Sequence, residues 1–116
     1  MYRTKDPATV LSPKDCIQSV EVIFDGKDNP TYSVAIVEWQ GIKKIGVRWN
    51  INQREWSDQS KQNGKECLGE PNSRGYATWF MLPEGLVDSL IKNDELGEKI
   101  KVALEELRSN RDENTL

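Results

Sequence analysis

Residues 31–50 read TYSVAIVEWQGIKKIGVRWN, and this stretch decides the fold. Two runs rich in Val, Ile, Tyr and Trp flank Gln40-Gly41, which is the pattern of two antiparallel strands joined by a tight two-residue turn. Strand side chains alternate between faces, so the second strand has an apolar face and a basic one. The apolar face carries Ile45, Val47 and Trp49. The basic face carries Lys44, Gly46 and Arg48. We predict a β-hairpin whose second strand turns its apolar face to the core and exposes a short basic ladder.

The first strand of this hairpin is apolar on both faces. Val34 and Ile36 lie on one side of it, and Ala35, Val37 and Trp39 lie on the other. Such a strand is typical of the inside of a sheet that is covered on both faces. A helix, a second subunit or a ligand could provide the cover on the second face.

The flanking sequence extends the hairpin into an α+β fold. SVEVIF at 19–24 predicts a strand before it, and TWFML at 78–82 predicts a fourth strand after it. Pro83-Glu84 has the chemistry of a helix start, and a second helix is expected after Asn93-Asp94. Its apolar positions recur at helical spacing, at Leu96, Ile100, Ala103, Leu104 and Leu107. We predict a four-stranded antiparallel β-meander followed by a C-terminal helix or helices.

The chain of 116 residues has the length of one domain. We expect an N-terminal arm at 1–18, a single domain at 19–109 and a frayed tail at 110–116. Residues 51–77 are polar and poor in apolar anchors, so we expect a long loop there, either binding or flexible. No apolar run reaches the roughly 20 residues of a transmembrane helix, and no secretory signal stands at the N-terminus, which favours a cytoplasmic location.

The sequence offers no constellation for catalysis. It contains no histidine, and Cys16 and Cys67 are isolated, which argues against a zinc site and against a disulfide. Asp25 and Glu38 could suggest a metal-dependent nuclease, but Gln40 stands where such a site needs lysine. No glycine-rich phosphate loop is present. We therefore expect a non-enzymatic protein without a cofactor.

The charge is unevenly distributed along the chain. The net charge is -3, yet residues 42–65 hold six basic side chains and only two acidic ones. The basic side chains are Lys43, Lys44, Arg48, Arg54, Lys61 and Lys65. Trp49 and Trp56 lie among them, and lysine or arginine with aromatic rings is the combination that holds single-stranded nucleic acid. The segment after Pro83 is acidic instead.

The order of elements resembles that of the single-stranded DNA-binding fold of the transcriptional coactivator positive cofactor four and its small bacterial and phage relatives. The resemblance rests on TYSVAIVEWQGIKKIGVRWN for the central strands and on SRGYATWFMLPEGLVDSL for the loop, last strand and helix start. It implies a curved sheet, a homodimer and a strand held on the concave face. Carried over by position, it implies contacts from Lys43, Lys44 and Arg48, and from Arg74 with Trp79.

Two functions remain open from the sequence. The first is a single-stranded nucleic-acid-binding protein, dimeric through its C-terminal helix, that acts in transcription regulation or DNA metabolism. Its expected contacts are Lys43, Lys44, Arg48, Trp49, Arg54, Arg74 and Trp79. The second is a protein-binding regulator or inhibitor that uses the sheet face and the acidic helix as its interface.

Overall fold

The chain is described by a computed structural model that covers residues 1–28, 31–92 and 94–114. It divides into two compact units, Met1–Leu82 and Pro83–Leu116, and each is described here by itself. Within the described residues, the strands lie in the first unit, and the second unit holds one helix of nine residues and one of 21.

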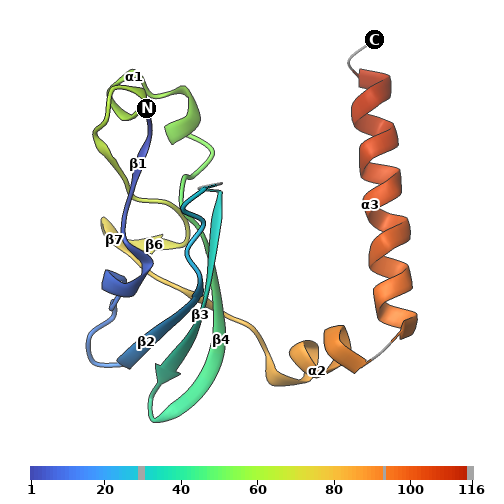
Figure 1. Ribbon diagram of the computed structural model, residues 1–116, viewed down its shortest axis with the longest axis horizontal. Coiled ribbons are helices and arrows are strands. Elements are labelled where there is room, and N and C mark those ends of the chain that lie inside the picture. Colours follow the sequence, from blue (N-terminus) through green and yellow to red (C-terminus); the bar gives the residue numbers. More distant parts are fainter. Residues whose placement is uncertain (29–30, 93, 115–116) are drawn as a thin grey trace. The chain divides into compact units, whose positions relative to one another are not determined.

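A four-stranded antiparallel sheet forms the first unit, as the sequence predicts (Figure 1). Its order is β2 (Ile17–Phe24), β3 (Tyr32–Trp39), β4 (Ile42–Trp49) and β8 (Phe80–Met81). The predicted hairpin is confirmed, because β3 and β4 pair without a break from Tyr32 opposite Trp49 to Trp39 opposite Ile42. Gln40 and Gly41 both have positive φ, 49° and 82°, which is the turn that suits the right-handed twist of a hairpin.

The outer strand β2 is less regular than the hairpin. It begins at Ile17, two residues before the predicted start, and its register with β3 shifts twice. The shifts lie between Ile17 and Ser19 and between Val22 and Phe24. Each is a β-bulge or similar irregularity, which leaves only the middle of β2 regularly paired.

The core lies on one side of this sheet, and it is not the side that the sequence pattern predicts. Ala35 and Val37 of β3 are fully buried there, and they pair with Gly46 and Lys44 of β4. A Cβ on Gly46 would lie 3.2 Å from Cε3 of Trp79 and 2.8 Å from Cγ2 of Val37. Gly46 thus allows the Trp79 ring to pack against the strand. The face of Lys44, Gly46 and Arg48 is therefore the core face, and the predicted basic ladder is wrong.

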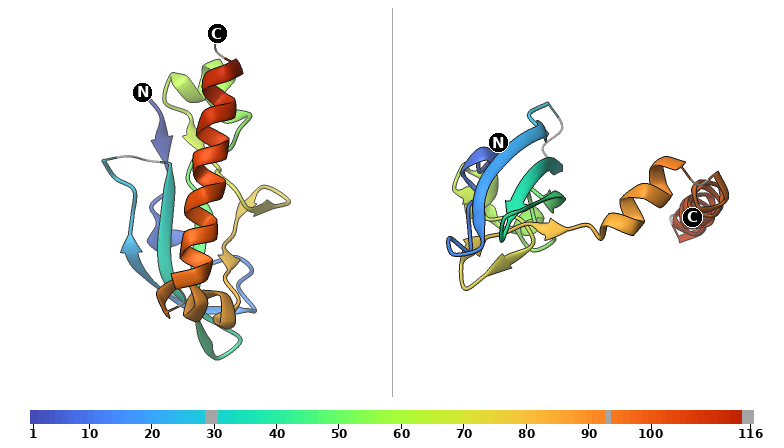
Figure 2. Two further views of the ribbon diagram at one scale, coloured as in Figure 1. Left: turned by 90° about the vertical axis from the view of Figure 1, so that its right-hand side faces the viewer. Right: turned by 90° about the horizontal axis from the view of Figure 1, so that it is seen from below.

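The core is completed by residues outside the sheet. Val10 and Ala77 are buried in the same cluster as Ile17 and Trp79. Val10 comes from the N-terminal segment and Ala77 from the segment at 51–77, and both segments lie on this side of the strands in Figures 1 and 2. They form the second layer of the unit.

Short elements run through both of these segments. The N-terminal segment holds β1 (Arg3–Thr4) and η1 (Pro7–Thr9). Residues 51–77 hold η2 (Glu55–Ser57), α1 (Gln59–Gln62), β5 (Glu66–Cys67), β6 (Asn72–Ser73) and β7 (Tyr76–Ala77). The strands β1 and β5 pair in parallel, and the amino group of Met1 donates to the carbonyl of Gln62 at 2.6 Å. The expected loose arm and long loop are thus joined to each other along their length.

The second unit consists of α2 (Glu84–Lys92) and α3 (Asp94–Asn114). The predicted helix starts after Pro83 and at Asp94 are confirmed, while Asn93 lies outside the described residues. The helix α3 extends to Asn114, into the expected frayed tail, and residues 115–116 lie outside the described residues. Several apolar side chains of this unit are exposed, namely Leu86, Leu90, Ile91, Ile100, Val102, Leu104 and Leu107. Of the helices in the described part of the chain, none is long and apolar enough to cross a membrane.

Candidate interaction surface

The side of the sheet opposite the core carries a continuous apolar surface. Because paired residues of neighbouring strands share a face, the register defines its members. We call the following side chains the aromatic face: Phe24, Tyr32, Val34, Ile36, Ile45, Val47, Trp49 and Phe80. They come from all four strands, and Val34, Ile36, Ile45 and Val47 at the centre are only partly buried.

Four aromatic rings stand out from this surface. The exposed fractions are 41% for Phe24, 45% for Tyr32, 58% for Trp49 and 57% for Phe80. The rings of Phe24 and Tyr32 contact each other, with centroids 5.0 Å apart. Single exposed apolar residues are ordinary, but a contiguous group of large ones marks a binding surface.

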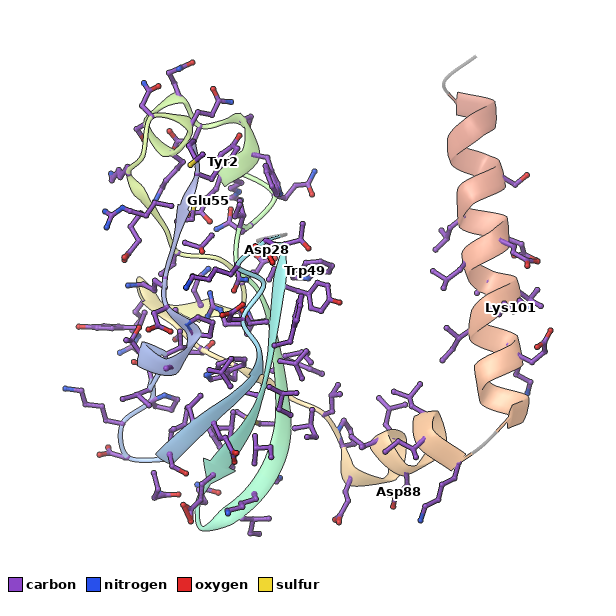
Figure 3. All side chains as sticks on the ribbon, in the orientation of Figure 1. Tyr2, Asp28, Trp49, Glu55, Asp88 and Lys101 are labelled. Carbon is purple, nitrogen blue, oxygen red and sulfur yellow. The ribbon has the colours of Figure 1, made fainter. Side chains whose placement is uncertain are left out.

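A hollow of about 420 Å³ opens on the aromatic face at the end of β4. We call it the apolar hollow. Its lining is almost wholly apolar and consists of Tyr32, Val47, Trp49, Pro71 and Phe80, with Arg48 and Glu70. Figure 3 places Trp49 at this end of the sheet. The volume is that of a site for one or two side chains or a small ligand.

The backbone fixes the walls of the apolar hollow. Trp49 pairs with Tyr32 on one side, and on the other it exchanges two hydrogen bonds with Glu70, at 2.6 and 2.8 Å. The chain turns at Gly69, whose φ is +73° and where a Cβ would collide with the carbonyl of Trp49. Glycine at this position therefore allows the two backbones to approach, and the hollow exists before any ligand binds.

A second hollow, of about 270 Å³, lies on the other side of Trp49. We call it the mixed hollow, because its lining combines indole rings with polar groups. It is lined by Thr31, Trp49, Ile51, Asn52, Gln53, Trp56 and Glu70. Trp49 and Glu70 border both hollows.

The charge on this side of the sheet is acidic. Glu21 and Glu38 lie on the same face as Ile36, and Glu70 borders the hollows. Among the described residues, these three carboxylates are opposed by the ammonium of Lys43, the register partner of Glu38, and by the buried guanidinium of Arg48, which lines the apolar hollow. A surface of this sign attracts cations and repels phosphates.

Arg48, the centre of the predicted basic ladder, is inside the molecule. It is only 4% exposed, and its guanidinium donates to the carbonyls of Thr78 at 2.7 Å and Leu68 at 2.5 Å. Burial lowers the pKa of Arg48 to about 10, and the nearby negative charge of Glu55 acts in the opposite direction. The side chain remains charged at neutral pH and holds residues 68–78 against β4. It is not available to a nucleic acid as predicted.

Trp79 is also buried instead of exposed for stacking. Its indole Nε1 donates to the carbonyl of Val10 at 2.8 Å, and its ring packs in the core. Of the two tryptophans predicted as contacts, only Trp49 is accessible.

The remaining predicted contacts are exposed but dispersed. Lys43 is on the side of the aromatic face, whereas Lys44 is on the core side of the same strand. Arg54 precedes η2, and Arg74 occupies the turn between β6 and β7 with a positive φ of 53°. The four charges therefore lie on three different segments, and the two adjacent lysines lie on opposite faces of β4.

Glu55 is the principal residue that the sequence analysis overlooked. It is 5% exposed, and its carboxylate accepts from the backbone N–H groups of Asn52, Leu68 and Gly69 at 2.7 to 3.0 Å. The ammonium of Lys61 lies 3.2 Å away. Burial by itself raises the pKa of Glu55, but these hydrogen bonds outweigh it and hold the pKa below its ordinary value. The carboxylate therefore ties the two ends of the 52–69 segment together.

The described residues provide no obvious centre for metal chemistry. No group of three or more potential ligand residues gathers in the described ranges. Cys16 and Cys67 are both free, and burial raises the pKa of the Cys67 thiol. The side chains of Asp25 and Glu38 make local contacts, with the N–H of Lys27 and the hydroxyl of Ser19.

Comparisons with protein-family models, with curated proteins and with solved structures find no match to this chain. The resemblance to the positive cofactor four family stays a prediction.

Proposed function

We propose that the protein is a non-enzymatic binding module that recognises another protein through the aromatic face. The observation that carries this proposal is the group of four exposed aromatic rings, three of which line a preformed apolar hollow. Aromatic side chains that converge on a pocket are the usual energetic centre of protein interfaces. A rigid pocket reduces the entropy lost on binding.

The charge distribution favours a protein partner over a polyanion. A partner for this surface needs apolar side chains for the centre and basic groups for the acidic surroundings of Glu21, Glu38 and Glu70. Phosphates would instead meet these three carboxylates, together with exposed Lys43 and with Arg48, whose guanidinium already donates to the carbonyls of Thr78 and Leu68. Complementary charge would also speed association.

Site-specific photo-crosslinking tests this proposal. With p-benzoylphenylalanine in place of Phe80, we expect a discrete protein adduct in cells that produce the chain. The same probe in place of Tyr76, an equally exposed ring on β7, should give no such adduct. The adduct should vanish in a Trp49→Ser background. The identified partner, once purified, should bind the wild-type chain and not the Trp49→Ser chain. Adducts that form equally at both positions would contradict the proposal.

Single-stranded nucleic acid is the second candidate. The observation in its favour is that exposed rings on a sheet can stack with bases, at about 1 to 3 kcal/mol per base. Fluorescence anisotropy with a labelled random oligonucleotide over a range of salt tests it. Affinity that falls steeply with salt, and falls further in Lys43→Ala/Lys44→Ala, would favour this candidate over the first.

For either candidate function, we also propose that the chain forms a homodimer through the second unit. Ile100, Leu104 and Leu107 recur at helical spacing on α3 and are exposed. Apolar side chains at this spacing form the seam along which two helices pair.

A further inference from the structure

We propose that the mixed hollow binds the guanidinium of an arginine in the partner, while the apolar hollow takes the apolar side chain next to it. This inference rests on the proposed function and names the chemistry of the partner segment. The two hollows share Trp49 and Glu70 as a common wall. Neighbouring side chains of one peptide can therefore reach both.

Two indole rings form the aromatic part of the mixed hollow. Trp49 and Trp56 both line it, and both are substantially exposed. A guanidinium is planar and stacks on aromatic faces, so indole rings are its preferred apolar surroundings.

The Trp56 ring and the Trp49 backbone are both held in position. Tyr2 meets the Trp56 ring edge-on, with centroids 4.8 Å apart, and its hydroxyl donates to the Trp56 carbonyl at 2.8 Å. The backbone of Trp49 is paired with Tyr32 and with Glu70. The hollow is therefore built on paired strands and on the N-terminal segment.

Glu70 supplies the negative charge for a cation. Glu70 is exposed and borders the mixed hollow. Its backbone is fixed by the two hydrogen bonds with Trp49. Within residues 1–28, 31–92 and 94–114, no hydrogen bond or ion pair occupies its carboxylate. An arginine can thus donate to this carboxylate while its plane rests on an indole ring.

The apolar hollow sets the chemistry of the neighbouring residue. Apart from Arg48 and Glu70 its lining is apolar, so a Leu, Ile or Phe side chain would remove the surfaces of Tyr32, Val47 and Phe80 from water. The inferred recognition element is an apolar residue adjacent to arginine in a basic protein.

The four tryptophan indole N–H signals in an NMR titration of the full chain provide the test. The probe is N-acetyl-leucyl-arginine amide, and its matched control replaces arginine with neutral citrulline. We expect the Trp49 and Trp56 signals to shift to saturation with the arginine probe. The signals of Trp39 and of buried Trp79 report on the core and should stay in place. The citrulline probe should bind at least about tenfold more weakly, because it lacks the cation.

Two charge-matched variants locate the cation. Glu70→Gln should weaken the arginine probe to the level of the citrulline probe, whereas Asp15→Asn, which removes an exposed carboxylate outside the aromatic face, should leave the affinity unchanged. Unchanged Trp39 and Trp79 signals in each variant would show that it is folded.

The outcomes separate this inference from the proposed function. Equal affinity for the arginine and citrulline probes would overturn the cation site, while leaving apolar binding by the aromatic face intact. If neither probe shifts Trp49 or Trp56, the inferred element is wrong, and crosslinking at Phe80 decides separately whether the face binds a protein. Failure of both experiments would overturn both proposals.

Discussion

At the scale of single residues, Arg48 shows that the sequence pattern of a buried structural arginine can be the same as that of an exposed arginine that binds a ligand. Alternation places Lys44 and Arg48 on one face of β4, and that part of the prediction holds. Which side of the sheet becomes the core depends on Trp79, which packs on the face of Gly46 and lies 31 residues after Arg48 in the sequence. Gly46 is the local signal that was available, since a glycine within a strand often marks the close approach of another group.

Arg48→Ala is expected to lower the free energy of unfolding by about 3 kcal/mol, because the partly buried carbonyls of Leu68 and Thr78 lose a charged donor. Urea unfolding followed by circular dichroism measures this change. Lys44→Ala, an exposed side chain on the same strand, serves as the control and should stay within about 0.5 kcal/mol of wild type. Equal stability of both variants would mean that Arg48 has no structural role.

At the scale of elements, local pattern predicted the strands well, and long-range contacts explain what it missed. The hairpin follows from Gln40-Gly41 and its apolar flanks, which are neighbours in the sequence. The segment at 51–77 is held in place mainly by hydrogen bonds to Glu55 and Arg48, and few apolar contacts contribute. Its polar composition reflects this kind of support. A composition of that kind cannot be distinguished from a mobile loop unless the partners of each polar group are known.

The same reasoning explains which parts of the candidate surface the sequence revealed. Trp49 was predicted, because the basic and aromatic stretch around it is conspicuous. Tyr32, Phe80 and Glu70 were not, since only the strand register and the Trp49–Glu70 pairing bring them together. Their separation along the chain gives no local signal.

The Glu55 carboxylate makes the stability of this segment dependent on pH. Its pKa is lower in the folded chain than its ordinary value of 4.5, so its stabilisation is complete above about pH 4.5. The stabilisation is lost as the pH falls through the folded-state pKa. We expect urea unfolding from pH 7 to pH 3 to show this loss in wild type. Glu55→Gln should be less stable at pH 7 and should vary less with pH.

Glu66 also has a lowered pKa, because Lys5 donates to it, so some dependence should persist in the Glu55→Gln variant. Glu21→Gln, which replaces an exposed carboxylate on β2, is the control and should follow the wild-type profile. A Glu55→Gln profile identical to that of wild type would contradict the assigned role of this carboxylate.

At the scale of the whole molecule, the chain combines a sheet unit that has its own core with a helical unit whose described apolar side chains are largely exposed. A nine-residue helix such as α2 is too short to be stable by itself in water. The second unit therefore requires apolar contacts for its stability, and a second copy of the chain can supply them.

Sedimentation equilibrium of the full chain should give the mass of a dimer. Leu104→Glu/Leu107→Glu should give the 13.3 kDa of a single chain, because two charges would enter the apolar seam. Glu105→Gln, at a neighbouring exposed position, is the control and should remain dimeric. A monomeric wild-type chain would overturn the proposed dimer.

The two irregularities of β2 affect how safely the chain can display an apolar surface. The strand forms the outer margin of the sheet, and a flat margin of eight residues would offer its free backbone groups to other chains as a template for fibril growth. Register shifts near both ends of β2 bend that margin and shorten its flat part to Ser19–Val22. The irregular margin thus limits the length of backbone with which another chain could pair, while the rings of the aromatic face stay exposed.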